Sequence, residues 1–303
     1  MGKPVIETEL ANIILKNPIM PASGTFGYGE EFSEIYDLNL LGAVVTKSVT
    51  KEPRYGNPLP RIAECKGGML NSIGLQNPGI DLFIEKELAG LRNIYEGIII
   101  CNISGFTTEE YGYLARRLND EPIDMIEVNI SCPNVEEGGD AFGSSAKLSN
   151  AITKEVRKNT DKPVFMKLTP NVTDISEIAK ACEEGGADGI SLINNFKAMK
   201  IDIKNRRTVT EKKYAGLSGD AIRPIALRMV NEVYHSIKLP IIGIGGISSA
   251  ENAIEMIMAG AKAVQIGSAN FRNPFICPNI ITDLPKVMKE NGIDSLDEIR
   301  GII

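Results

Sequence analysis

The stretch Pro240-Ile241-Ile242-Gly243-Ile244-Gly245-Gly246-Ile247 decides the fold, because it opens a strand, turn and helix unit that recurs along the chain. Its first five residues are a short apolar run before paired glycines, which predicts a buried strand. A helical pattern follows over residues 250–258, with Ser248 and Ser249 as candidate N-caps and a glycine two residues past its end as a stop signal. Residues 263–266 predict the next strand, which completes a βαβ unit.

Eight apolar runs of this kind occur, and helical patterns such as residues 108–118 and 175–184 follow most of them. A closed (β/α)8 TIM barrel explains eight such units better than an open sheet does. The 303 residues suit one barrel, which typically takes about 250 residues. We therefore expect residues 1–303 to form a single α/β barrel domain. The expected strands are residues 18–21, 42–46, 97–101, 124–130, 163–168, 189–193, 240–244 and 263–266.

Two insertions interrupt this rhythm. Residues 51–77 are rich in Gly, Pro and Asn, and residues 197–219 are first charged and then rich in glycine. Both follow expected strands, so they should lie on the C-terminal face of the barrel, where barrel enzymes keep their reacting groups. Long loops in compact domains are more often functional than idle. We expect them to cover the active site as a pocket wall or a lid.

The composition excludes several classes of protein. Hydrophobic residues make up 43% and charged residues 24%, which is a globular balance, and the net charge of -6 argues against a nucleic-acid partner. Residues 1–10 have neither a basic region nor an apolar run, and no segment is long enough to span a bilayer, so we expect no signal peptide and no membrane partner. Five cysteines without Cys-x-x-Cys spacing fit neither a disulfide framework nor a zinc site. We expect a reducing, cytoplasmic location and no metal.

A lone cysteine, Cys132, follows the expected strand at 124–130 within Asn129-Ile130-Ser131-Cys132-Pro133-Asn134. A cysteine thiol has an ordinary pKa of about 8.5, close enough to working pH to accept a proton. Its place at a strand end between two asparagines therefore suggests a catalytic base. The alternative is a buried small hydrophobe, since free cysteine is often buried. Only one histidine, His235, occurs, so histidine-based triads explain the chain poorly.

Lys47 and Lys167 also lie at expected strand ends, among apolar neighbours. A buried cation needs an anionic partner, and on a barrel that partner can be a phosphate, a substrate carboxylate or a reduced cofactor. Either lysine can instead extend outward to solvent. A Schiff-base lysine is the rival catalytic interpretation.

Glycines end the seventh and eighth expected strands, in Gly243-Ile244-Gly245-Gly246-Ile247 and Gln265-Ile266-Gly267-Ser268. They expose backbone N–H groups where barrels commonly bind a phosphate. The alternative is that these glycines only permit tight turns.

Four motifs occur along the chain in a consistent order, namely Asn71-Ser72-Ile73-Gly74-Leu75-Gln76-Asn77-Pro78-Gly79, Asn129-Ile130-Ser131-Cys132-Pro133-Asn134, Gly216-Leu217-Ser218-Gly219 and Ile242-Gly243-Ile244-Gly245-Gly246-Ile247. In these motifs the chain closely resembles the catalytic subunit of class 1B dihydroorotate dehydrogenases, and the resemblance covers essentially its whole length. It implies a barrel with one FMN over its C-terminal face, which oxidises (S)-dihydroorotate to orotate in pyrimidine biosynthesis.

The resemblance also assigns roles to residues. Cys132 would take the proton from C5 of the substrate while the C6 hydrogen leaves as hydride to N5 of FMN, and Lys47 would lie between flavin and substrate. Lys167 would stabilise the anionic reduced flavin on its N1 side. The implied FMN contacts are Ser23, Lys47, Ser48, Asn102, Asn129, Lys167, Ile193, Gly219, Gly245, Gly246, Gly267 and Ser268, and the implied substrate contacts are Lys47, Asn71, Ser72, Ile73, Gly74, Leu75, Asn129, Asn194 and Asn195.

The resemblance favours one class within the family. The Leu75-Gln76-Asn77-Pro78 form of the loop resembles the NAD-linked class rather than the fumarate-linked class 1A, and the chain lacks the N-terminal extension and serine base of the quinone-reducing class. In the NAD-linked class, a homodimer of this chain joins an electron-transfer subunit, which carries FAD and a two-iron, two-sulfur cluster, in a heterotetramer.

Four alternatives stay open, and the first is the fumarate-linked class 1A enzyme. Asn195 stands where the family usually has threonine, so a related dihydropyrimidine substrate remains an alternative to dihydroorotate. More remote alternatives are a Schiff-base barrel aldolase and a non-catalytic ligand-binding barrel.

Overall fold

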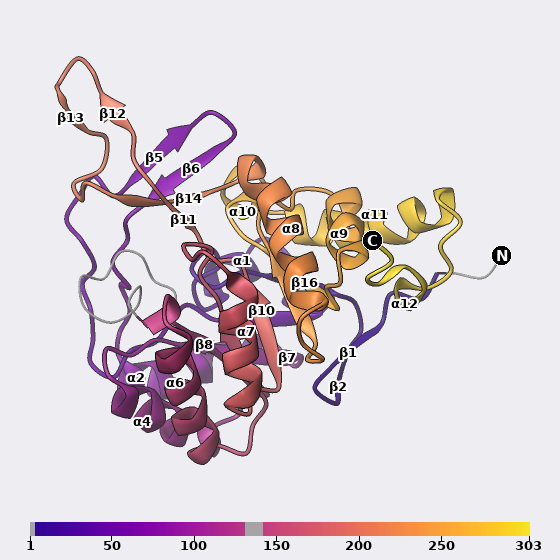
Figure 1. Ribbon diagram of the computed structural model, residues 1–303, viewed down its shortest axis with the longest axis horizontal. Helices are drawn as coiled ribbons and strands as arrows, with labels where there is room; N and C mark the ends of the chain where they lie inside the picture. Colours follow the sequence, from indigo (N-terminus) through magenta and orange to yellow (C-terminus); the bar gives the residue numbers. More distant parts are fainter. Residues whose placement is uncertain (1–3, 131–141) are drawn as a thin grey trace.

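An eight-stranded parallel sheet forms the centre of the computed structural model, which describes residues 4–130 and 142–303 (Figure 1). The two outer strands of this sheet meet, because the backbone N–H of Gly42 donates to the carbonyl of Ile19 at 2.9 Å. The predicted (β/α)8 barrel and all eight predicted strands are confirmed. In sheet order the strands are β3 (Ile19–Pro21), β16 (Ala263–Ile266), β15 (Ile241–Ile244), β10 (Gly189–Leu192), β9 (Val164–Lys167), β8 (Met125–Asn129), β7 (Ile98–Ile103) and β4 (Ala43–Val45).

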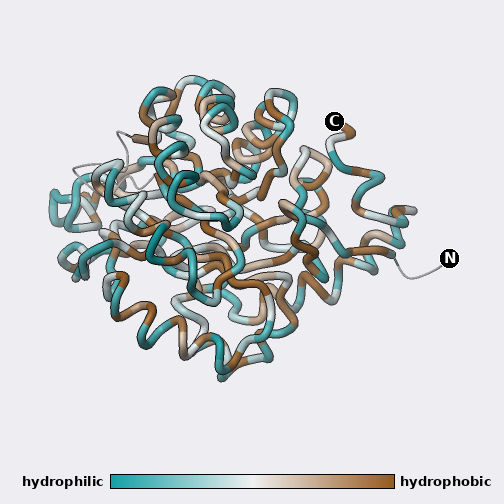
Figure 2. The backbone as a smooth tube through the Cα atoms, turned by 90° about the horizontal axis from the view of Figure 1, so that it is seen from below, coloured by the Kyte–Doolittle hydropathy of each residue, from teal (hydrophilic) through white to brown (hydrophobic). Residues whose placement is uncertain are grey.

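The barrel strands are apolar along nearly their whole length because both of their faces are covered. Figure 2 shows hydrophobic segments running through the middle of the molecule and hydrophilic ones around it. Inside the barrel, Met20, Phe165 and Ile242 pack in one buried cluster. The outer faces of the strands pack against the surrounding helices in a second, larger cluster.

The helices surround the barrel, and several begin at capping residues. Ser249, rather than Ser248, caps α9, since its side chain accepts a hydrogen bond from the backbone N–H of Asn252. The helices predicted at 175–184 and 250–258 have those bounds, and the one predicted at 108–118 extends by one residue. The helices are α1 (Glu30–Ser33), α2 (Ile80–Leu82), α3 (Ala89–Ile94), α4 (Thr108–Asn119), α6 (Ala146–Lys158), α7 (Ile175–Glu184), α8 (Arg223–Tyr234), α9 (Ala250–Met258), α10 (Ala269–Arg272), α11 (Ile276–Glu290) and α12 (Leu296–Ile299), with a π-helical turn η2 (Phe83–Leu88) and the 3-10 turns η1 (Leu38–Leu40) and η3 (Asp220–Ile222).

A hairpin that was not predicted closes one end of the barrel. Strands β1 (Thr8–Leu10) and β2 (Ile13–Leu15) pair antiparallel, and the fully buried Leu10 and Leu15 belong to the cluster inside the barrel. That cluster includes Met125 and Ala263, which are the first residues of their strands. The hairpin therefore covers the N-terminal end and leaves the C-terminal end for a pocket.

The two insertions fold together beside the C-terminal end of the barrel. They form one antiparallel sheet in the order β11-β14-β6-β5, which projects from the barrel at the upper left of Figure 1. Its strands are β5 (Ile62–Cys65) and β6 (Gly68–Asn71) from the first insertion and β11 (Phe196–Ala198) and β14 (Ala215–Ser218) from the second, which also carries the hairpin β12 (Ile201–Asp202) and β13 (Arg207–Thr208). Their predicted place at the C-terminal face of the barrel is confirmed.

Within the described ranges, no helix has the length and apolar character needed to cross a lipid bilayer.

Candidate active site

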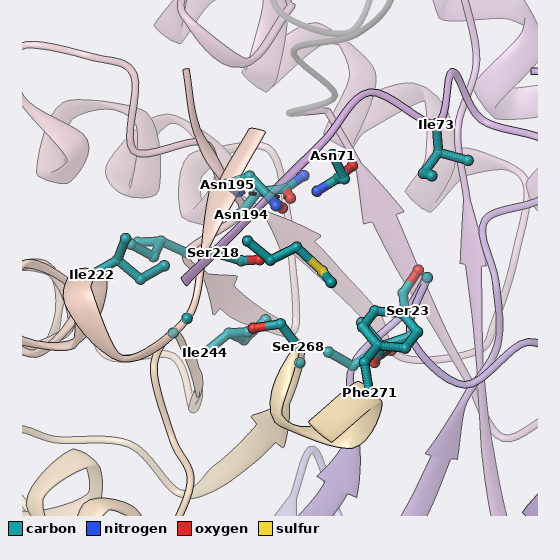
Figure 3. A pocket seen from close by; sticks show the side chains of 18 of the residues that line it. Ser23, Asn71, Ile73, Asn194, Asn195, Ser218, Ile222, Ile244, Ser268 and Phe271 are labelled. Carbon is teal, nitrogen blue, oxygen red and sulfur yellow. Dashed lines mark hydrogen bonds between the residues drawn. The ribbon is translucent and has the colours of Figure 1, made fainter. Parts of the chain in front are cut away.

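A pocket at the C-terminal ends of the barrel strands gathers most of the residues that the sequence predicted for the site (Figure 3). Side chains reach it from the barrel strand ends, from β6 and β14 of the inserted sheet, and from α10. The predicted residues that line it are Ser23, Lys47, Ser48, Asn71, Ile73, Gly74, Leu75, Asn129, Lys167, Ile193, Asn194, Asn195, Gly219, Gly245, Gly246, Gly267 and Ser268.

Two predicted residues are placed differently, and a third is not described by the structure. Ser72 and Asn102 are fully buried and do not line the pocket. Ser72 is the neighbour of pocket residues on both sides along the chain, and Asn102 lies in β7 beneath the strand ends. Cys132 lies outside the described residues, so its predicted role as a base stays a prediction.

The floor of the pocket holds Lys167, the last residue of β9, in a buried polar network. Its ammonium Nζ donates to Glu127 Oε1 at 3.1 Å and to Gln265 Oε1 at 3.2 Å. Glu127 Oε1 also accepts from Asn102 Nδ2 at 2.6 Å, and its Oε2 accepts from Gln265 Nε2 at 2.6 Å. Burial alone would raise the pKa of Glu127, but the Lys167 charge, the amide of Gln265, the hydroxyl of Ser191 and the amide of Asn102 hold that pKa below its ordinary value.

Asn102 completes this network on one side only. Its Nδ2 is engaged by Glu127, whereas its buried Oδ1 has no hydrogen-bond partner among the described residues. Buried amide oxygens are nearly always satisfied in folded proteins. An unpaired acceptor beside the pocket floor therefore fits a site for a ligand that brings an N–H group.

Glycines at the ends of β15 and β16 form a backbone cradle on one side of the pocket. Gly245 and Gly246 have φ values of +131° and +70°, and a Cβ at either position would lie within 2.8 Å of a neighbouring side chain. Gly267 is open, since an added Cβ would meet only Ala22 Cβ, at 4.0 Å. Backbone N–H groups left uncovered in this way suit an anionic ligand such as a phosphate.

Asparagine side chains gather on another wall. Figure 3 shows Asn71, Asn194 and Asn195 close together above the pocket. Asn194 Nδ2 donates to Asn129 Oδ1 at 3.3 Å, and Asn194 Oδ1 accepts from the backbone N–H of Asn195 at 2.8 Å. Carboxamides both donate and accept, so this wall can recognise a planar ligand whose edges carry alternating N–H and C=O groups.

Neighbouring residues hold these asparagines in place. The carbonyl of Asn129 accepts from Tyr111 Oη at 2.8 Å and from Ser104 Oγ at 3.3 Å, which fixes the end of β8. The carbonyl of Asn195 accepts from Asn171 Nδ2 at 3.1 Å. Gly216 on β14 makes room for Asn195, because a Cβ there would lie 2.7 Å from Asn195 Cβ.

Lys47 follows β4 and lines the same pocket. Its ammonium lies over the backbone of Gly24, where an added Cβ would be 3.3 Å from Nζ. Gly24 has a φ of +88°, which glycine adopts without strain. The hydroxyls of Ser23 and Ser48 are 3.4 Å apart, so the ends of β3 and β4 meet here.

The sequence prediction missed several residues of the site. Apolar lining from Ile62, Met69 and Phe271 was not expected, because these residues come from the inserted sheet and α10, whose approach depends on distant pairing. Glu127 was also missed, although a charge within the apolar run Met125-Ile126-Glu127-Val128 is itself a signal. A carboxylate in a strand that is buried on both faces must have a partner.

Comparisons with known proteins agree with one another. A family model described as dihydroorotate dehydrogenase matches residues 5–288. Proteins named "Dihydroorotate dehydrogenase B (NAD(+)), catalytic subunit" are similar over nearly the whole chain. The protein from Geobacillus sp. (strain WCH70) is 51% identical over 297 residues, which cover 98% of this chain and 95% of that protein. The protein from Oceanobacillus iheyensis is 50% identical over 301 residues, which cover 98% and 99%, and the protein from Lachnoclostridium phytofermentans is 50% identical over 294 residues, which cover 97% and 98%.

Proposed function

Because the chain belongs to the dihydroorotate dehydrogenase family, we propose that it oxidises dihydroorotate to orotate in pyrimidine biosynthesis, as the catalytic subunit of an NAD-linked enzyme. The observation that carries the proposal is the pocket, which brings two lysines, four asparagine amides and the glycine-rich ends of β15 and β16 to one face of the barrel. A Schiff-base aldolase is less well supported, since Lys167 is engaged by Glu127 and Gln265 rather than free to attack a carbonyl.

The family is flavin-dependent, and the residues of the pocket fit FMN. The cradle of Gly245, Gly246 and Gly267 offers backbone N–H groups to the phosphate. The unpaired Oδ1 of Asn102 suits a ring N–H, and the ammonium of Lys167 suits negative charge that develops on a reduced ring. When bound, FMN would supply the acceptor for the hydrogen and the two electrons that leave the substrate.

The asparagine wall and Lys47 would bind the substrate. Dihydroorotate is a cyclic imide that carries a carboxylate on a tetrahedral carbon, so the amides of Asn71, Asn129 and Asn194 can match its N–H and C=O groups. The ammonium of Lys47 would pair with negative charge on the ligand. Asn195 would add a longer donor and acceptor than threonine offers, and Asn171 holds its backbone in place.

The proton at C5 needs a base, and we assign it to Cys132. The thiolate would take this proton while the hydrogen at C6 leaves with its electron pair, so that a C=C bond forms and no covalent enzyme intermediate is needed. This assignment is supported by the sequence position of Cys132, three residues after the last residue of β8. Hydrogen bonds from Tyr111 and Ser104 hold that end of β8 in place.

The proposal includes a partner. The relatives are named as NAD-linked catalytic subunits, so the electrons would leave through an electron-transfer subunit that carries FAD and a two-iron, two-sulfur cluster, joined to a homodimer of this chain. A cytoplasmic location belongs to the same proposal. It is supported by the four cysteines of the described ranges, all of which are unpaired, as a reducing compartment requires.

The first experiment is an anaerobic titration of the purified chain with dihydroorotate, in which the absorbance of oxidised flavin is measured at about 450 nm. We expect a yellow protein that bleaches as orotate forms. A colourless protein that FMN does not reconstitute would overturn the flavin assignment. A yellow protein that bleaches with another dihydropyrimidine, and not with dihydroorotate, would overturn the substrate assignment.

A second addition separates the classes of the family. We expect the bleached chain to stay reduced when fumarate is added, and to be reoxidised by NAD only together with the electron-transfer subunit. Rapid reoxidation by fumarate alone would instead indicate the fumarate-linked class.

A further inference from the structure

Glu127 is a buried acid that the proposed reaction does not use. It lies in the middle of β8 with no exposed surface, between the register neighbours Asn102 on β7 and Phe165 on β9. It does not line the pocket, whereas Lys167, to which it is bound, does. A fully buried carboxylate is costly unless every oxygen is matched, so this residue needs a structural or functional explanation.

The contacts of Glu127 hold Lys167 in one position. Its two oxygens bind Lys167 and Gln265, and the other end of the Gln265 amide binds Lys167 in turn, which closes a ring of three side chains. An ammonium carries three N–H groups. Two of them are therefore held by the barrel, and the third has no partner among residues 4–130 and 142–303, so it can serve a ligand in the pocket.

The charges of the pair are arranged across the pocket floor. Lys167 lines the pocket and Glu127 lies behind it, so a ligand above the floor meets a dipole with its positive end forward. The attraction of a dipole for an anion is much weaker than that of a lone cation, because the field of the carboxylate opposes that of the ammonium. The strength with which the floor stabilises a negatively charged ring therefore depends on Glu127.

We propose that Glu127 is a positioning residue for the proposed reaction, which aims the Lys167 ammonium at the flavin and limits its stabilisation of the reduced ring. The inference rests on the proposed function and goes beyond it, since it assigns the balance between oxidised and reduced flavin to a residue that touches neither flavin nor substrate. The floor keeps FMN reducible by dihydroorotate and still able to release its electrons.

The test is the reduction potential of the FMN-loaded chain and of four variants, measured with reference dyes and without substrate. Glu127→Gln removes the opposing charge, so we expect reduced FMN to bind at least tenfold more tightly relative to oxidised FMN than in the unmodified chain. For a two-electron couple, a tenfold change in this ratio of affinities raises the reduction potential by ~30 mV. Cys101→Ala is the matched control, because Cys101 is buried and neutral, lies on β7 beside Asn102, and belongs to the outer hydrophobic cluster. We expect a change of less than twofold for this control.

A second comparison tests whether Glu127 acts through Lys167. Lys167→Met should favour oxidised FMN, and adding Glu127→Gln in that background should change the binding ratio by less than twofold, because Glu127 takes up a proton once the ammonium is gone and no opposing charge remains. No rise for Glu127→Gln, no fall for Lys167→Met, an equal rise when Glu127→Gln is added to Lys167→Met, or an equal rise for Cys101→Ala would each overturn the inference. A chain that binds no FMN at all would instead overturn the proposed function.

Discussion

Replacing Lys167 with methionine tests the buried ion pair through the stability of the protein. Lys167→Met keeps an unbranched apolar stem of similar length but removes the ammonium that lies 3.1 Å from Glu127. The Glu127 carboxylate then keeps only its amide donors, in a position without exposed surface. Breaking a buried pair by removing one partner typically costs about 3–5 kcal/mol, because an uncompensated charge remains.

This cost has an upper limit, because Glu127 can take up a proton and so lose its uncompensated charge. The ordinary pKa of a glutamate is 4.5, and holding it protonated costs about 1.36 kcal/mol for each pH unit above that value. The limit is therefore about 3.4 kcal/mol at pH 7 and about 0.7 kcal/mol at pH 5.

The free energy of unfolding depends on pH with opposite signs in the two proteins. In the unmodified chain the folded state lowers the pKa of Glu127. The contribution of this carboxylate to stability is therefore complete above pH 4.5 and is lost only as the pH falls through the folded-state pKa. In Lys167→Met the folded pKa is raised, so the folded state binds the extra proton and stability falls as the pH rises above 4.5. The difference between the two proteins should therefore grow by up to about 2.7 kcal/mol from pH 5 to pH 7.

The assay is urea unfolding of both proteins, freed of any bound flavin, at pH 5, 6 and 7. The double variant Glu127→Gln/Lys167→Met serves as the control, because it has no carboxylate to protonate and should show no additional pH dependence. A loss of stability in Lys167→Met that is the same at all three pH values would refute the reasoning, since it would trace the loss to packing rather than to the buried charge.

Four further predictions address the site. Cys132→Ala should retain FMN and bind orotate while flavin reduction by dihydroorotate slows about 10²–10⁴-fold, measured by anaerobic stopped flow; near-normal reduction would sink the assignment of the base. Gly245→Ala should lower the free energy of unfolding by about 1–3 kcal/mol, because of its positive φ and close neighbours. Gly267→Ala, which has open space, should leave stability within about 0.5 kcal/mol and weaken FMN binding instead; titration that finds unchanged affinity would contradict the phosphate cradle. Tyr111→Phe should cost about 0.5–1.5 kcal/mol, since its hydroxyl binds the carbonyl of Asn129, and thermal unfolding that shows no loss would argue against this role.

The barrel could be predicted from the sequence because each strand has a local signal. A run such as Ile241–Ile244 is apolar on both faces and bounded by proline and glycine, and the helix after it has its own caps. The hairpin of β1 and β2 was not predicted, because its strands are only three residues long and half buried, which leaves too short a pattern to recognise.

Long-range pairing explains what else was missed. The two insertions were expected on the same face, but nothing local indicates that Asn71 on β6 pairs with Gly216 on β14, which lies 145 residues further along the chain. The partners of Glu127 likewise lie on β7, β9 and β16, so its network became visible only in the closed barrel.

The shared sheet of the two insertions has a consequence for the redesign of this enzyme. Strand β6 is paired on one side with β5 from its own insertion and on the other with β14 from the second. A chimera that exchanged one insertion with a relative's would have to reproduce the β6–β14 register of a foreign partner, or leave a bare strand edge above the pocket. The two insertions therefore form one transplantable module, and a change of substrate preference by loop exchange requires both to be moved together.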